Sequence, residues 1–100
     1  MKRLEDPHGP LELAAGELQA IVLPANPTTG YSWQVEADGV YLALLSQEFE
    51  PSGPVVGAGG RESFQFRALQ PGSTDLRFHY RRPWEGQSLE TRNYRVTIRR

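Results

Sequence analysis

Side chains that can act as nucleophiles, general bases or metal ligands are few and widely separated in this sequence. It has no cysteine, which excludes a thiol nucleophile, a disulfide and a zinc–thiolate site. Its two histidines stand apart: His8 has proline and glycine beside it, and His79 lies on the polar side of an alternating segment. No serine lies in the pattern of a nucleophile elbow. We therefore expect no catalytic residue, no metal and no cofactor, and the chain is not predicted to be an enzyme.

One polar turn has residue types that suit binding better than catalysis. Pro27 fixes φ, and Gly30 is able to take a positive φ, so the chain can turn sharply between them. Thr28 and Thr29 would then place small hydroxyl-bearing side chains at the tip. The turn leads directly into an alternating apolar segment, and its full sequence is Asn26-Pro27-Thr28-Thr29-Gly30-Tyr31.

Two further segments have unusual loop compositions. The first is Gly57-Ala58-Gly59-Gly60, which lacks the lysine of a phosphate-binding loop and the spacing of a dinucleotide fingerprint. It is either a flexible turn or a backbone that lies close against a partner, where a Cβ would collide. The second is Arg82-Pro83-Trp84. A tryptophan in a loop of this kind is unlike a core residue and typical of an interface hot spot.

Short alternating segments must position these loops. Apolar residues alternate with polar ones, or form short β-branched runs, at 10–13, 18–23, 31–36, 64–68, 76–80 and 94–98. Residues 40–49 fit a marginal helix as well as a strand, and their neighbours favour a strand. About seven short strands without a convincing helix predict an all-β fold, an immunoglobulin-like antiparallel β-sandwich with no disulfide.

Strand parity predicts where the loops lie. If successive strands run antiparallel, the connections 25–30, 50–60 and 82–87 share one end of the sandwich, and plain turns such as Asp38-Gly39 and Pro71-Gly72 occupy the other. Specialised loops at one end indicate a composite binding surface. With 100 residues we expect a single domain over 1–100, in which residues 1–9 form a flexible tail.

Together the three segments resemble the chagasin-like inhibitors of papain-type cysteine proteases. The turn at 26–31 is similar to their signature loop, with Tyr31 in place of the usual phenylalanine, and the other two segments follow in the family's order. The resemblance implies that three loops block a protease cleft together without being cleaved. Thr28 and Thr29 would lie over the catalytic Cys–His pair, residues 57–60 along one side of the cleft, and Trp84 and Arg82 on the other side.

Composition narrows the choice of partners. The net charge of −1 argues against nucleic acid, and no apolar run approaches the roughly 20 residues of a membrane span. Residues 1–50 carry two basic and eight acidic side chains and residues 51–100 carry nine and four. This difference indicates either an ordinary solvated surface or a basic patch that contributes to binding. The expected partner is a papain-type cysteine protease, bound by a monomer. The alternative is a β-sandwich adhesion or ligand-binding module that uses the same loops for a different partner.

Overall fold

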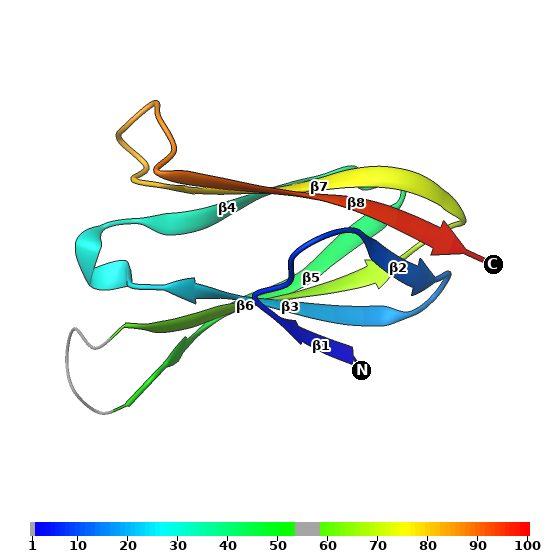
Figure 1. The fold of residues 1–100 in the computed structure, drawn as a ribbon, viewed down its shortest axis with the longest axis horizontal. Helices are drawn as coiled ribbons and strands as arrows, with labels where there is room; N and C mark the ends of the chain where they lie inside the picture. The colour runs from blue at the N-terminus through cyan, green and yellow to red at the C-terminus, as the bar shows by residue number, and fades with distance from the viewer. Residues whose placement is uncertain (1, 54–58) are drawn as a thin grey trace.

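Alternating apolar and polar residues form eight strands in the computed structural model, which describes residues 2–53 and 59–100 (Figure 1). A short 3-10 helix, η1 (Pro27–Thr29), lies between the third and fourth strands. The strands are β1 (Lys2–Glu5), β2 (Leu11–Ala14), β3 (Leu18–Ala25), β4 (Ser32–Ala37), β5 (Leu42–Pro51), β6 (Gly60–Ala68), β7 (Gly72–Arg81) and β8 (Glu90–Arg99). Within the described residues no helix is long and apolar enough to cross a membrane.

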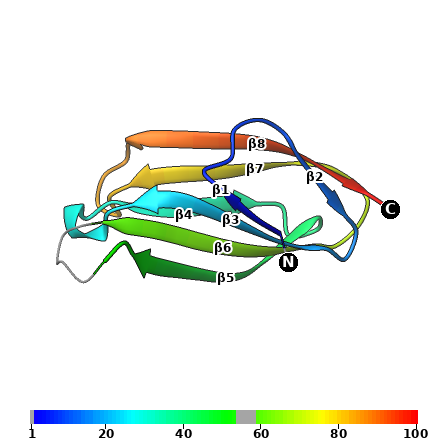
Figure 2. The same cartoon turned by 60° about the horizontal axis from the view of Figure 1, so that its bottom comes forward.

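The strands form two packed sheets, in the orders β1-β3-β6-β5 and β2-β8-β7-β4 (Figures 1 and 2). The predicted all-β sandwich is therefore confirmed. Four of the strand pairs are antiparallel, but β1 pairs with β3 in parallel and so does β2 with β8. These two exceptions involve the N-terminal strands, which no hairpin turn joins to their partners.

The core lies between the two sheets and follows the predicted alternation. Phe64 and Phe66 of β6 face Phe78 of β7, with ring centroids 5.0 and 6.3 Å apart. Residues 40–49, for which a helix was the alternative, are part of strand β5. A register shift between Leu44 and Ser46 marks a β-bulge there, which explains why the apolar residues of this segment do not keep to one parity.

The N-terminal segment differs from the predicted tail at 1–9. Lys2–Glu5 forms β1, and its Leu4 packs against the core. Beyond it, the Asp6 N–H donates to the Val22 carbonyl (2.7 Å), and the Tyr94 hydroxyl donates to the Pro7 carbonyl (2.9 Å). The sequence did not predict this strand, because Leu4 is its only apolar residue and one apolar side chain cannot form an alternating pattern. The proline, glycine and charged residues around it are typical of a loop.

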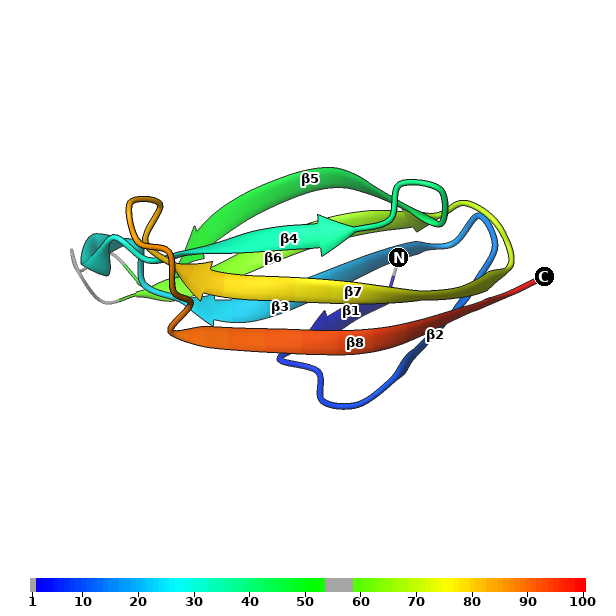
Figure 3. The ribbon, with the colours of Figure 1, turned by 90° about the horizontal axis from the view of Figure 1, so that it is seen from above.

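The first and third predicted binding loops, and the two described ends of the second, lie toward one end of the sandwich. Figure 3 shows η1, the turn between β7 and β8, the end of β5 and the start of β6 together at the left, opposite the C-terminus at the right. The prediction from strand parity is therefore confirmed. The second loop is shorter than the predicted 50–60, because β5 continues to Pro51 and β6 begins at Gly60.

Candidate functional site

The first loop is a turn that its own side chains close. The Thr28 N–H and hydroxyl both donate to the side-chain oxygen of Asn26, at 3.2 and 2.6 Å. The Thr29 N–H and hydroxyl both donate to the Asn26 carbonyl, at 3.2 and 2.7 Å. Gly30 then reverses the chain with φ 83°, a value that favours glycine. Asn26 is thus the acceptor on which the turn is built.

The two threonines are exposed at the tip, as predicted. Their hydroxyl protons are already used within the loop, and the Thr29 hydroxyl also accepts the Tyr31 N–H at 3.4 Å, so only unused acceptor capacity remains on the hydroxyl oxygens. A partner that meets this tip can therefore donate to the hydroxyls, but gains no hydroxyl proton from them without opening the turn.

Aromatic stacking fixes the base of the first loop. Tyr31 stacks on Tyr80 with centroids 5.3 Å apart, and Trp33 lies 4.7 Å from the same ring. The Tyr80 hydroxyl also accepts the Asn26 N–H (3.0 Å), and the Trp33 indole N–H donates to the Pro24 carbonyl (2.9 Å). Trp33 is buried and Tyr31 is half-buried, so the tip stands on a rigid aromatic base.

Arg82 joins the third loop to the first. Its Nε–H donates to the Thr29 carbonyl (3.2 Å), and its guanidinium carbon lies 4.6 Å from the Tyr31 ring centroid. The guanidinium also donates to Glu85 within the third loop (3.1 Å), where the Glu85 N–H closes a turn on the Arg82 carbonyl. The sequence predicted Arg82 as a contact for the partner, and the structure places it between two loops of its own chain.

Trp84 is the most exposed large apolar side chain among the described residues, at 73%. Its indole lies beside Gly30, where an added Cβ would stand 2.9 Å from the Trp84 ring. The ring also lies 5.9 Å from the Arg82 guanidinium. Gly30 therefore serves two purposes, because it turns the first loop and leaves room for the indole. Pro83 precedes Trp84 and is exposed in the same loop.

The second loop is described only at its two ends, and Gly57 and Ala58 lie outside the described residues. The Ser52 N–H donates to the Gly59 carbonyl (3.1 Å). Gly59 has φ 79° and lies next to the Ala25 carbonyl and Asn26 of the first loop. A Cβ on Gly60 would collide with the Glu50 carbonyl. Both glycines are thus required by this chain's own backbone, before any partner is considered.

A buried carboxylate lies below the first and second loops. Glu62 of β6 is only 7% exposed, and burial raises its pKa despite the opposing hydrogen bonds from Gln47 and the Trp33 backbone. The Gln47 side chain donates to Glu62 (2.7 Å) and to the Trp33 carbonyl (3.2 Å). These bonds connect β5 and β6 of one sheet to β4 of the other, just after the first loop ends.

Sequence reasoning missed Tyr80, Glu62 and Gln47. Tyr80 had a usable signal, because it is the cross-strand partner of Trp33 and aromatic pairs commonly stabilise sheets. The other two looked like ordinary polar positions on strands. Among residues 2–53 and 59–100, no group of three or more His, Asp or Glu side chains could hold a metal ion.

Comparison with known proteins identifies the family to which this chain is similar. A family model described as chagasin family peptidase inhibitor I42 matches residues 12–98. Chagasin of Trypanosoma cruzi is 33% identical over 95 residues, which cover 89% of this chain and 86% of chagasin.

Two solved structures share the fold over nearly the whole chain. The cysteine protease inhibitor EhICP2 of Entamoeba histolytica matches with a TM-score of 0.82 and 26% identity, over 98% of this chain and 96% of its own. PbICP-C, solved in complex with falcipain-2, matches with a TM-score of 0.75 over 99% and 100% of the two chains. The latter is 18% identical, so it is a likeness of fold alone.

Proposed function

The chain belongs to the chagasin family of peptidase inhibitors, and from this we propose that it is a reversible, tight-binding inhibitor of papain-type cysteine proteases. Its three loops would occlude the active-site cleft together. The similar EhICP2 is described as a cysteine protease inhibitor, which supports this class of target. The proposed activity is inhibition, and no catalytic step by this chain is involved.

The observation that carries the proposal is the direct connection between the first and third loops. Arg82 donates to the Thr29 carbonyl, and the Trp84 indole lies against Gly30. Two loops from different strand pairs therefore form one surface before any partner arrives. Nanomolar affinity requires about −12 kcal/mol, and a surface that is already ordered loses less conformational entropy on binding.

Each loop has a proposed role. Thr28 and Thr29 would lie over the catalytic Cys–His pair and offer hydroxyl lone pairs and methyl groups. The segment 57–60 would follow one side of the cleft through backbone hydrogen bonds. Trp84 would pack on an apolar surface on the other side, and Arg82 would hold the first and third loops together while binding takes place.

Resistance to cleavage follows from the form of the first loop. Proteases of this kind require an extended chain at the scissile bond, whereas the turn is closed by hydrogen bonds from Thr28 and Thr29 to Asn26. Opening it would break these bonds and displace the Arg82 contact. The loop would therefore occupy the cleft without presenting a bond in the geometry needed for attack.

The test is a titration of active papain with the purified chain at fixed substrate concentration. We expect inhibition that is complete at a one-to-one ratio, that reverses on dilution, and that leaves the chain at full mass after prolonged incubation. Full papain activity at a large excess of the chain would contradict the proposal and favour the adhesion or ligand-binding module. Progressive cleavage of the chain would contradict the proposed mechanism.

A further inference from the structure

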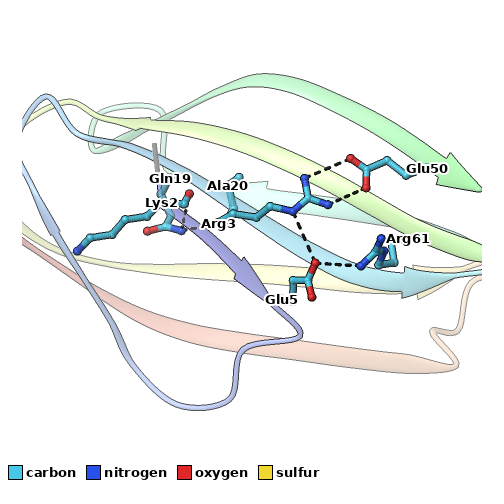
Figure 4. A network of polar contacts seen from close by, with 7 residues as sticks. All are labelled: Lys2, Arg3, Glu5, Gln19, Ala20, Glu50 and Arg61. Carbon is cyan, nitrogen blue, oxygen red and sulfur yellow. Dashed lines mark hydrogen bonds and ion pairs between the residues drawn. The ribbon is translucent and has the colours of Figure 1, made fainter. Parts of the chain in front are cut away.

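Strand β1 carries a charged network that reaches across its sheet. Leu4 faces the core, so Arg3 and Glu5 face outward. Arg3 forms two parallel bonds to the Glu50 carboxylate of β5, at 2.7 and 3.2 Å, and its Nε lies 3.7 Å from Glu5. Glu5 in turn pairs with Arg61 of β6 at 2.9 Å. Figure 4 shows these four side chains linked one to the next, from Glu50 through Arg3 and Glu5 to Arg61.

The network ends at the base of the second loop. Glu50 and Arg61 are cross-strand partners, and the next pair toward the loop is Pro51 with Gly60. β1 and β5 are the two edges of this sheet, with β3 and β6 between them. β1 pairs through its backbone only with β3, among the described residues. The side chains of Arg3 and Glu5 therefore connect the β1 edge of the sheet to the ends of β5 and β6 next to the second loop.

The end of this hairpin has little apolar packing of its own. Phe64 of β6 is fully buried. The next inward-facing residue toward the loop is Glu62, a carboxylate and not an apolar side chain. Beside it on β5, Phe49 is 40% exposed. The ends of β5 and β6 thus have few hydrophobic contacts with the opposite sheet. Their orientation therefore depends more on polar contacts.

β1 is itself held at several points. Its backbone pairs with β3 from Lys2 to Glu5, and the buried Gln19 side chain donates to the Lys2 carbonyl at 3.2 Å. Just beyond β1, Asp6 forms an ion pair with Arg92 of the other sheet. Because the β1 segment contacts both sheets, the backbone positions of Arg3 and Glu5 are fixed.

We propose that β1 is an electrostatic brace for the second loop, in which Arg3 and Glu5 are positioning residues that hold the ends of β5 and β6 in the orientation used to bind the peptidase. The segment lies outside the residues 12–98 that match the family model. The two parallel bonds between Arg3 and Glu50 fix the relative orientation of the two side chains and also attract them. The Arg3 hydrogen bonds also hold the pKa of Glu50 below its ordinary value.

The first test measures how strongly Arg3→Ala, Glu50→Ala and the double variant inhibit papain. This measurement rests on the proposed function. Exposed ion pairs are individually weak, so we expect an inhibition constant about two- to fivefold larger for Arg3→Ala. Because both side chains belong to one contact, the double variant should be no weaker than the single variants. Additive losses would overturn the pairing.

Arg99→Ala provides the matched control. Arg99 forms an exposed ion pair with Glu12 at 3.2 Å, between β8 and β2 at the opposite end of the sandwich. Its loss should alter thermal stability about as much as the loss of Arg3, and should leave inhibition unchanged. Equal inhibition by the Arg3 and Arg99 variants would overturn the brace.

Amide hydrogen exchange tests the brace without a protease. Arg3→Ala should accelerate exchange at Ser52, Arg61 and their neighbours, and should leave the β7–β8 turn unchanged. Unaltered exchange at the hairpin end would refute the inference even if inhibition fell. If the wild-type chain did not inhibit papain, the proposed function would fail, and this measurement would still decide whether the brace exists.

Discussion

Replacing Trp84 by alanine should weaken inhibition far more than stability. An aromatic side chain buries about 150–250 Å² when fully covered. With 73% of Trp84 exposed, roughly 110–180 Å² remain to be covered by a partner, worth about 2.7–4.5 kcal/mol at about 25 cal/mol per Å². A real interface covers part of this area, and alanine keeps some of it. We therefore expect a loss of about 2 kcal/mol or more, equivalent to a roughly 30-fold larger inhibition constant.

The assay is steady-state inhibition of papain, with the melting temperature measured on the same preparations. Val40→Ala is a suitable control, because Val40 is 58% exposed and lies in the β4–β5 turn at the opposite end. It should leave the inhibition constant unchanged, and neither variant should change the unfolding free energy by more than about 0.5 kcal/mol. An unchanged inhibition constant for Trp84→Ala would refute the role assigned to this side chain. A proportional loss of stability would show that the indole supports the fold instead.

Three other substitutions test how the loops are built. Gly60→Ala should lower the melting temperature, because its Cβ would collide with the Glu50 carbonyl; a stable variant with weak inhibition would contradict this. Arg82→Lys should weaken inhibition, because lysine has no planar fork to bond the Thr29 carbonyl while stacking on the ring beside it; unchanged inhibition would remove Arg82 as a positioning residue. The pKa of Glu62 is higher in the folded chain than the ordinary value of 4.5, so protonation of this carboxyl stabilises the folded state. The wild-type melting temperature should therefore fall as pH rises from 4.5 through the raised pKa. The fall should be smaller in Glu62→Gln, which has no carboxyl to ionise. Equal pH profiles would show that burial of this carboxyl carries no such linkage.

Sequence patterns predicted the loops' common location because strand alternation is a local and repeated signal. Alternation at Phe64 and Phe66, or at Tyr94 and Val96, identifies a strand and its inward face. Counting the strands then assigns each connection to an end. This reasoning needs no knowledge of tertiary contacts, and it succeeded even for the irregular β5.

The partners of particular side chains could not be predicted in the same way. Nothing in the sequence distinguishes an arginine that meets a protease from one that bonds the Thr29 carbonyl, as Arg82 does. Likewise a run of glycines does not indicate whose backbone comes close, and at Gly60 it is the chain's own Glu50. Strand β1 was missed because its pairing with β3 joins residues about 17 positions apart through a charged sequence.

The three loops are held by different kinds of contact, and this difference predicts how each responds to conditions. The first and third loops are joined directly, from Arg82 to Thr29, above stacked aromatic rings. The second loop approaches the first at Gly59, and its strand ends depend on charged contacts such as Arg3 with Glu50. Salt screens exposed charges and leaves apolar stacking almost unaffected. The orientation of the second loop should therefore be the part of the binding surface that ionic strength alters first, and its share of the affinity should fall before that of Trp84.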